Sequence, residues 1–315
     1  MMEAKAGLRV PCSVAAGQAV ALVSPASVVA PERITGAAGA LRQWGLRPEE
    51  SAHCRGHYGV FGDVINYSGT VAQRLADLNW ALRSPEVRAI VCNRGGYGAV
   101  QLIDGLDYDA IAADPKWVIG FSDVSALHAA MHHAGVMSLH APMAKHLTEN
   151  GTMGEVSGWI HSIVTGGPWP DYSLPPSAGN RPGTATAQLT GGNLAVLSAL
   201  VPTGYNLLLP GNILFIEDIG ESVYRVERML HTLRLAGILP RLAGLVVGQF
   251  TNYRDNAQGT AMRQMLEQMV APYGYPVAFD FPVGHVDRNL PLIEGATTTL
   301  AVTASGVRLT QHKPF

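Results

Sequence analysis

The sequence contains little charge, and neither sign is concentrated in any segment. Charged residues make up 15% of the 315 residues, and 22 basic against 24 acidic side chains give a formal net charge of −2. No basic run occurs, so a nucleic-acid-binding function has no electrostatic support. Hydrophobic residues make up 47% of the chain, which is typical of a folded globular protein and excludes a largely disordered one.

Long apolar runs and paired cysteines are also missing. No run of 18 apolar residues occurs, so no membrane-spanning helix is predicted. The three cysteines, Cys12, Cys54 and Cys92, are odd in number and share no metal-ligand spacing, which favours a reducing compartment over a disulfide framework. We interpret residues 19–24 as a buried strand and not as part of a signal peptide, and therefore expect a cytoplasmic protein.

Short apolar runs alternate with amphipathic stretches in the first half of the chain. Strands are expected at residues 19–24, 47–54, 87–92, 116–120 and 136–139, helices at 31–44 and 71–82 and through residue 103, and a glycine-rich loop at 56–69. This alternation predicts a parallel sheet, whose functional loops gather at the carboxyl ends of the strands.

Glycine and proline interrupt the pattern between residues 165 and 184, where we expect a linker without regular structure. Beyond it, strands are expected at 185–189, 213–216, 245–248 and 276–281, helices at 223–235 and 261–270, and a closing hairpin at 297–302 and 307–310. The predicted division is an N-terminal α/β domain at residues 1–165, a linker at 166–184 and a C-terminal mixed α/β domain at 185–315.

The segment around Ser122 combines an apolar strand, a turn of small residues and a helix-like pattern. A serine at such a corner projects its hydroxyl out of the sheet, beside the backbone N–H groups of the next turn, which suits a nucleophile. A helix N-cap explains the same serine, because serine commonly precedes helices. This segment alone leaves both interpretations open.

Three other loops that follow apolar strands carry candidate groups. Residues 94–98, with glycine at 95, 96 and 98, could expose backbone N–H groups to an anion or form a plain turn. Glu217 and Asp218 end a strand, where a buried carboxylate can orient an imidazole or an acid can begin a helix. His285 lies in a loop, as catalytic bases and solvated histidines both do.

Two further patterns are weaker. His128 and His132 have the i, i+4 spacing of a helical metal pair, but the zinc-protease glutamate and a third ligand are missing from the pattern, so no metal site is predicted. Residues 190–194 fit either a helix cap or a ligand loop.

Seven segments, taken in order, resemble the LD-carboxypeptidase family of serine peptidases, which includes murein tetrapeptide carboxypeptidases and microcin-immunity peptidases. They are residues 94–98, 120–123, 140–143, 191–194, 215–218, 224–230 and 284–285. Ala141 and Glu227 stand where the family usually has glycine and aspartate, and neither is a reacting group.

The resemblance implies a flavodoxin-like or Rossmann-like parallel sheet in the N-terminal domain and a mixed β/α domain of the swivelling type after it. It also implies a triad of Ser122 as nucleophile, His285 as general base and then acid, and Glu217 as the group that holds the imidazole. Backbone N–H groups of Gly96 and Asp123 would form the oxyanion hole.

The implied reaction releases terminal D-alanine from a murein tetrapeptide during peptidoglycan recycling, without a metal or cofactor. Arg94 and Arg225 are the candidates for binding the terminal carboxylate, because guanidinium groups bind carboxylates bidentately. The resemblance is compatible with a homodimer, and no nucleic-acid or membrane partner is expected.

Three other functions remain open. A microcin-immunity peptidase would cleave aminoacyl-nucleotide conjugates. An α/β-hydrolase esterase would share the chain order Ser, Glu, His, although Val124 stands where the nucleophile elbow has its second glycine. In a binding protein, Ser122 would only cap a helix.

Overall fold

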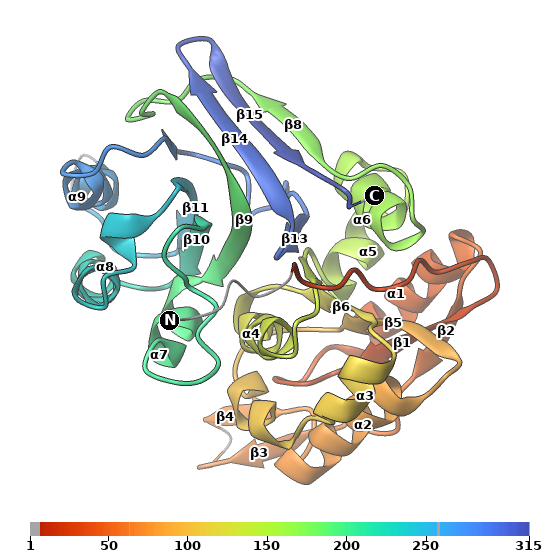
Figure 1. Ribbon diagram of the computed structural model, residues 1–315. Coiled ribbons are helices and arrows are strands. Elements are labelled where there is room, and N and C mark those ends of the chain that lie inside the picture. The colour runs from red at the N-terminus through yellow and green to blue at the C-terminus, as the bar shows by residue number, and fades with distance from the viewer. Residues whose placement is uncertain (1–6, 63, 257–258, 315) are drawn as a thin grey trace. The chain divides into compact units, whose positions relative to one another are not determined.

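The computed structural model describes residues 7–62, 64–256 and 259–314 (Figure 1). Residues 1–6 and 315, at the ends of the predicted domains, lie outside this range. Contacts within the chain define two compact units. The first comprises Met1–Pro168 and Leu290–Gly295, and the second comprises Trp169–Asn289 and Ala296–Phe315.

Six strands of the described chain form the sheet of the first unit. They are β1 (Ala19–Val23), β2 (Arg47–Glu50), β5 (Val87–Cys92), β6 (Trp117–Gly120), β7 (Ser138–His140) and β13 (Leu292–Glu294). Their order is β13-β7-β6-β5-β1-β2, and all neighbours are parallel except β13 and β7. Counted along the chain, the parallel strands have the flavodoxin-like order 2-1-3-4-5, as predicted. In such sheets ligands bind where the order reverses, at the carboxyl ends of β1 and β5.

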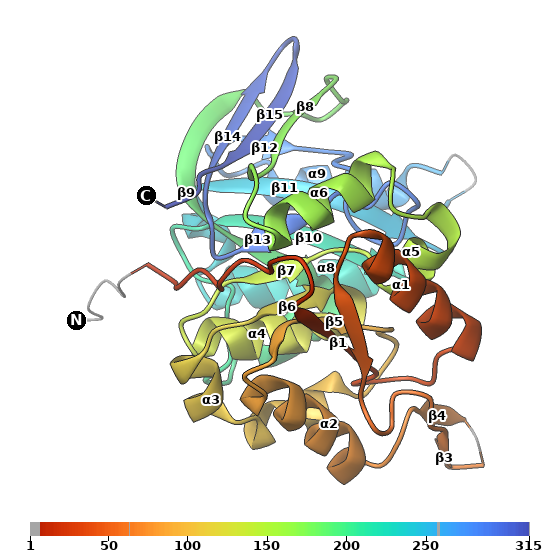
Figure 2. The same ribbon diagram turned by 90° about the vertical axis from the view of Figure 1, so that its right-hand side faces the viewer.

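Helices cover both faces of this sheet, which is why β1 is apolar and buried along its whole length. The helices are α1 (Pro31–Gln43), α2 (Val71–Arg83), α3 (Tyr108–Ala113), α4 (Ser125–His133), α5 (Ala144–Asn150) and α6 (Glu155–Val164). In Figure 2, α1, α5 and α6 lie on one face, and α2, α3 and α4 lie on the other. The capping box of Thr70 and Gln73 begins α2, because each side chain accepts a hydrogen bond from the other's backbone N–H.

Shorter elements connect these helices and strands. They are the hairpin β3 (Tyr58–Val60) and β4 (Ile65–Tyr67), and the 3₁₀ turns η1 (Ala99–Gln101), η2 (Ile103–Gly105) and η3 (Ser122–Val124).

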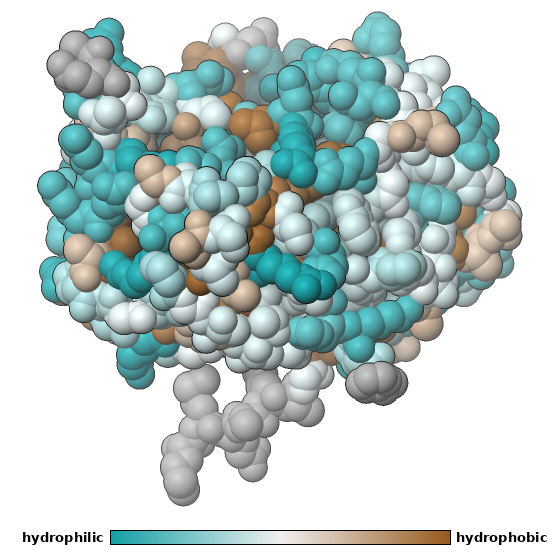
Figure 3. Space-filling model, turned by 90° about the horizontal axis from the view of Figure 1, so that it is seen from above, coloured by the Kyte–Doolittle hydropathy of each residue, from teal (hydrophilic) through white to brown (hydrophobic). Residues whose placement is uncertain are grey.

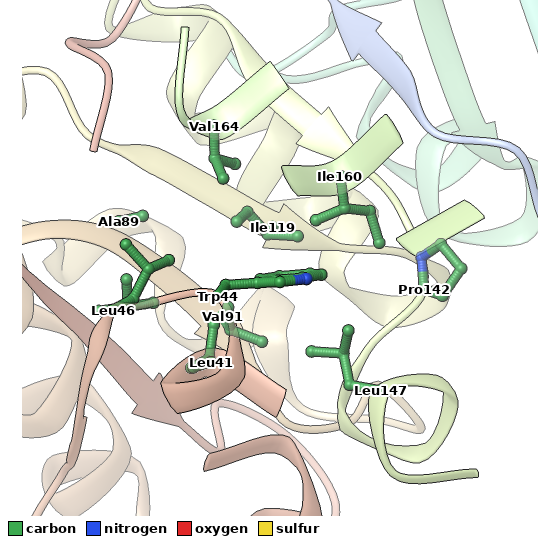
Figure 4. Close-up of a pocket in the computed structure, with 11 residues that line it drawn as sticks. Leu41, Trp44, Leu46, Ala89, Val91, Ile119, Pro142, Leu147, Ile160 and Val164 are labelled. Carbon is green, nitrogen blue, oxygen red and sulfur yellow. The ribbon is translucent and has the colours of Figure 1, made fainter. Parts of the chain in front are cut away.

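A small cavity lies against one face of the sheet in the first unit (Figure 4). Its volume is about 10 Å³, and its lining includes Leu41 and Trp44 near α1, Ile119 of β6, and Leu147 and Ile160 from α5 and α6. A void of this size barely holds one water molecule, and these side chains offer it almost no hydrogen-bond partners. The cavity is therefore a packing void, too small for a substrate.

Seven strands of the described chain form the sheet of the second unit, in the order β12-β11-β10-β9-β14-β15-β8. The strands are β8 (Asp171–Leu174), β9 (Gly183–Asn193), β10 (Ile213–Ile219), β11 (Gly244–Thr251), β12 (Val277–Ala278), β14 (Thr297–Thr303) and β15 (Gly306–Gln311). The helices are α7 (Leu194–Leu200), α8 (Val223–Leu235) and α9 (Ala261–Val270), with the 3₁₀ turn η4 (Leu239–Arg241).

Strand β9 gives this sheet its mixed character. Residues 183–188 pair antiparallel with β14, whereas residues 189–193 pair parallel with β10. The long curved ribbon of β9 is visible in Figure 1. The prediction of a mixed α/β arrangement in the second half of the chain is confirmed.

Several boundaries agree with prediction, including those of α8 and α9. Other expectations were wrong. The loop expected at 56–69 contains the β3–β4 hairpin, and the segment expected to be irregular at 165–184 contains β8 and the start of β9. The helix expected through residue 103 consists of two 3₁₀ turns. The hairpin strands, β8 and the two 3₁₀ turns have only three or four residues each, too few to show a hydrophobic period.

Residues 290–295 also differ from prediction. They fall within the predicted C-terminal domain but belong to the first unit, because β13 pairs with β7. Strand pairing between residues so far apart in sequence leaves no local signal.

Hydrophilic and intermediate residues cover most of the face seen in Figure 3, and hydrophobic residues show only in small patches. Within the described residues, no helix has both the length and the apolar character needed to cross a lipid bilayer.

Candidate active site

Ser122 occupies a strained turn between a buried strand and a helix. It follows β6 and Phe121, opens η3, and has a φ of +65°, which is rare for a residue with a side chain. Holding an L-residue in this region costs about 1–2 kcal/mol. A Cβ on Gly120 would lie 2.8 Å from Val124 Cγ1, so only glycine fits before the turn. The arrangement resembles a nucleophile elbow.

The interpretation of Ser122 as a helix N-cap is wrong. The N-cap position of η3 is Phe121, and that of α4 is Val124.

The glycine-rich loop at residues 94–98 lies directly beside this turn. A Cβ on Gly95 would lie 3.0 Å from Ser122 Cβ and 3.1 Å from the backbone nitrogen of Asp123. Gly96 has a φ of +102°, and a Cβ there would meet Ser27 Oγ at 2.3 Å. Glycine is therefore required at position 96, and a side chain at position 95 would crowd the turn that carries Ser122.

Two backbone N–H groups of this region are candidates for binding an oxyanion. Within the described residues, the Gly96 N–H has no hydrogen-bond partner. Asp123 lies in the first turn of η3, where N–H groups have no partner inside the helix. The Asp123 carboxylate is buried and accepts the N–H of Ala99 at 2.8 Å, which ties the glycine-rich loop to the serine turn. Burial raises the pKa of this carboxyl group.

Glu217 and His285 form a hydrogen-bonded pair in the second unit. His285 Nδ1 lies 2.7 Å from Oε2 of Glu217, which lies on β10 and is 0% exposed. A carboxylate only accepts hydrogen bonds, so Nδ1 carries the proton and Nε2 of a neutral imidazole is left as the basic nitrogen. Glu217 Oε1 is buried without a partner among the described residues.

Gly284 makes this pair possible. It has a φ of +120°, and a Cβ there would lie 2.8 Å from Glu217 Cβ. Its N–H donates to Asn289 Oδ1 at 2.9 Å, which holds the loop that carries His285.

Asp218, the neighbour of Glu217, has a different role. Its carboxylate accepts hydrogen bonds from Asn193 Nδ2 at 3.0 Å and from the Ala195 N–H at 2.8 Å, at the start of α7. Asn193 Oδ1 in turn accepts the N–H of Val196, so Asn193 caps α7 where β9 ends, as one of the two interpretations of this segment predicted. Burial raises the pKa of Asp218 to about 6.

The two candidate arginines belong to different units. Arg94 is exposed in the glycine-rich loop and donates to the carbonyl of Val28 at 2.7 Å. Arg225 is exposed on α8 and pairs with Glu221 at 3.5 Å.

The first histidine of the i, i+4 pair on α4 is held by hydrogen bonds. Both ring nitrogens of His128 are engaged, with Ser138 Oγ and the Gly120 carbonyl each 2.8 Å away, and burial lowers its pKa to about 4. Within the part of the chain that the structure describes, no group of three or more potential ligands could hold a metal ion.

The predicted site residues thus fall into two groups. Gly96, Asp123 and Ser122 come together in the first unit, and Glu217 and His285 in the second. Ser27 was not among the predicted site residues, although its hydroxyl accepts the N–H of Tyr97 at 3.1 Å. It follows β1 and acts on a loop some 70 positions later, so no local pattern could have identified it.

Comparison with known proteins gives one family. Residues 20–141 match the LD-carboxypeptidase N-terminal domain, and residues 186–300 match the LD-carboxypeptidase C-terminal domain. The murein tetrapeptide carboxypeptidase of Pseudomonas aeruginosa is 31% identical over 296 residues, which cover 89% of this chain and 92% of that protein.

Solved structures agree with this result. The muramoyltetrapeptide carboxypeptidase from Oxalobacter formigenes has a TM-score of 0.79 at 26% identity, over 94% of this chain and 100% of that one. The microcin C7 self-immunity protein of Escherichia coli is 23% identical over 78% of this chain and 80% of its own length. Its complex with aspartyl sulfamoyl adenosine has a TM-score of 0.82 at 21% identity, over 96% of this chain and 98% of that one, which shows a shared fold alone.

Proposed function

The chain belongs to the LD-carboxypeptidase family of peptidases, and we propose that it is a serine carboxypeptidase that removes the terminal D-alanine of a murein tetrapeptide. The observation that carries this proposal is the Glu217–His285 pair, in which a fully buried carboxylate holds an imidazole at 2.7 Å. Such a pair fixes the tautomer that a serine nucleophile needs, with Nε2 ready to accept a proton.

In the proposed first step, Ser122 Oγ attacks the carbonyl carbon of the diamino acid. His285 Nε2 takes the hydroxyl proton, and the carbonyl oxygen becomes an oxyanion. The N–H groups of Gly96 and Asp123 donate to that oxyanion. His285 then passes its proton to the amine of D-alanine, which leaves as the C–N bond breaks and an ester forms on Ser122.

In the second step, His285 takes a proton from water, and the resulting nucleophile attacks the ester. The oxyanion forms again at the same N–H groups, and Ser122 leaves with the proton that His285 returns. The products are the tripeptide and free D-alanine.

Recognition of a terminal carboxylate distinguishes a carboxypeptidase from an endopeptidase. We assign this role to Arg94 or Arg225, both of which are exposed residues. Arg94 shares its loop with Gly96, and Arg225 shares its unit with His285.

An aminoacyl-nucleotide conjugate is the second candidate substrate. The observation that favours it is the fold shared with a microcin self-immunity protein whose structure contains aspartyl sulfamoyl adenosine. The esterase and binding-protein interpretations are set aside, because the chain belongs to a family of peptidases.

Mass spectrometry of the products separates the two candidates. The protein is incubated with L-Ala-γ-D-Glu-diaminopimelate-D-Ala, with the same peptide ending in L-alanine, and with aspartyl sulfamoyl adenosine. We expect release of alanine from the first peptide alone. Cleavage of the nucleoside conjugate without cleavage of the tetrapeptide would reject the murein substrate in favour of the second candidate.

The proposal includes a cytoplasmic location, because the proposed substrates are muropeptides that are recycled in the cytoplasm. Cys12, Cys54 and Cys92 form no disulfide, which is compatible with a reducing compartment. The homodimer stays a prediction, which light scattering of the purified protein tests.

A further inference from the structure

Arg74 is a buried cation that takes no part in the proposed reaction. It lies on α2 and is 1% exposed. Among the described residues, none of its hydrogen bonds goes to a carboxylate. A buried charge without an ion pair is unfavourable unless its donors are satisfied, so the partners of this guanidinium show what it stabilises.

Those partners come from three separate loops. The Nε–H donates to the Gly69 carbonyl at 3.0 Å, just before α2. One terminal nitrogen donates to the Pro25 carbonyl after β1 at 2.7 Å and to the Gly98 carbonyl after β5 at 3.0 Å. The other donates to Gln101 Oε1 at 2.6 Å. Arg74 therefore ties together the loops at the carboxyl ends of β1 and β5, where ligands bind in sheets of this order.

The shape of the glycine-rich loop depends on this contact. Gly98 has a φ of +126°, and a Cβ there would lie 2.8 Å from the Arg74 guanidinium and 2.8 Å from the ring of Tyr67. The guanidinium also lies over the Tyr67 ring, 4.6 Å from its centroid, and the rings of Tyr67 and Tyr97 are 6.1 Å apart. Arg74 thus contacts Gly98 directly and Tyr97 only through the ring of Tyr67.

The remaining anchors of the loop lie on its other sides. Ser27 accepts the N–H of Tyr97 and donates its own N–H to the Gly95 carbonyl at 3.2 Å. Asp123 accepts the N–H of Ala99. The Gly96 N–H stands between these fixed points and has no partner of its own among the described residues.

We propose that Arg74 is a positioning residue, which holds the Gly96 N–H in the orientation that binds the oxyanion without itself contacting the substrate. The inference rests on the proposed function, because the oxyanion forms only if Ser122 attacks a carbonyl. A purely structural role would make Arg74 important for stability alone.

The test compares Arg74→Met and Arg74→Lys with a matched control at Lys116. Lys116 is also fully buried in the first unit, and its Nζ donates to the carbonyls of Ala81, Leu82 and Ser84 at the end of α2. Lys116→Met removes a cation of similar burial from a place that does not support the glycine-rich loop.

We expect Arg74→Met to lower kcat for the tetrapeptide by roughly ten- to a hundredfold, less than complete loss of an oxyanion donor. KM should stay within about threefold, because the interaction is made in the transition state. Arg74→Lys should fall between the parent and Arg74→Met, and Lys116→Met should keep its kcat even if it unfolds at a lower temperature. Equal kcat in Arg74→Met and Lys116→Met, or a rise in KM alone, would overturn the inference.

Hydrogen exchange measured by mass spectrometry gives a second readout that needs no activity. The backbone amides of residues 95–99 should exchange faster than in the parent in Arg74→Met and at the parent's rate in Lys116→Met. Equal exchange rates in the two variants would again overturn the inference. If the parent releases no D-alanine, the proposed function fails, while the exchange data still decide whether Arg74 orders the loop. If Arg74→Met does not fold, kcat is measured for Arg74→Lys and Ser27→Ala instead. Unchanged kcat in both variants would reject the proposal that Arg74 positions the Gly96 N–H.

Discussion

The position of His285 depends on a glycine, which makes Gly284→Ala an informative substitution. Gly284 has a φ of +120°, and an added Cβ would lie 2.8 Å from Glu217 Cβ and 2.9 Å from Glu217 Oε2. Neither atom can move away easily, because Glu217 is 0% exposed on a central strand. The loop that carries His285 must therefore shift.

Two costs follow from this substitution. A side chain in this backbone region costs on the order of 1–3 kcal/mol. The shift of the loop also breaks or lengthens the 2.7 Å hydrogen bond between His285 and Glu217. Loss of the group that orients a catalytic histidine lowers kcat by on the order of 10⁴ in other serine peptidases, so we expect a loss of about 10³–10⁴ here.

The assay is release of D-alanine from the tetrapeptide, with thermal unfolding measured in parallel. Gly211→Ala is the control, because Gly211 has a φ of +85° but an added Cβ would have no neighbour within 4 Å. Both variants should lose some stability, and only Gly284→Ala should lose turnover. Normal kcat in Gly284→Ala, or an equal loss of kcat in Gly211→Ala, would show that Gly284 does not hold His285 in a catalytic position.

Three further predictions address single groups. Glu217→Gln should lower kcat by roughly 10²–10⁴-fold with little change in unfolding temperature, because the side chain keeps its shape but loses the charge that stabilises the imidazolium. Unaltered kcat would contradict the role of Glu217 as the group that holds His285. The pKa of Asp218 is raised to about 6 in the folded protein, whereas its ordinary value, expected in the unfolded chain, is near 3.8. The stability that Asp218 contributes is therefore fully present below pH 3.8 and is lost as the pH rises through 6. The stability deficit of Asp218→Asn, measured by denaturant unfolding, should accordingly be larger at pH 4 than at pH 8, and a deficit that grows with pH would reject this. One of the two variants Arg94→Ala and Arg225→Ala should remove the group that binds the terminal carboxylate, and that variant should raise KM for the tetrapeptide by at least about tenfold. An arginine whose loss leaves KM unchanged does not bind the carboxylate.

The sequence was most informative where one segment carries its own signal. The strand, turn and helix around Ser122 were predicted correctly, because an apolar run, small residues and a helical period follow one another there. Helices α8 and α9 could be bounded because their apolar residues recur with a helical period. Membership of the family followed from seven short segments in order, and the comparisons confirmed it.

Features that depend on distant contacts could not be read in this way. β13 acquires its place only by pairing with β7, and Arg74 looks like an ordinary helix residue until the loops after β1 and β5 fold onto it. The need for glycine at position 284 likewise arises from Glu217, 67 positions earlier. In each case the physical constraint is tertiary, so a single sequence contains no pattern that reveals it.

The proposed mechanism assigns the release of D-alanine to Ser122 as the nucleophile. The most direct test of this assignment is mass spectrometry of L-Ala-γ-D-Glu-diaminopimelate-D-Ala after incubation with the parent protein and with Ser122→Ala. Circular dichroism first establishes that both proteins are folded. We expect the tetrapeptide to lose one D-alanine with the parent protein alone. Equal release by Ser122→Ala, or no release by either protein, would contradict it.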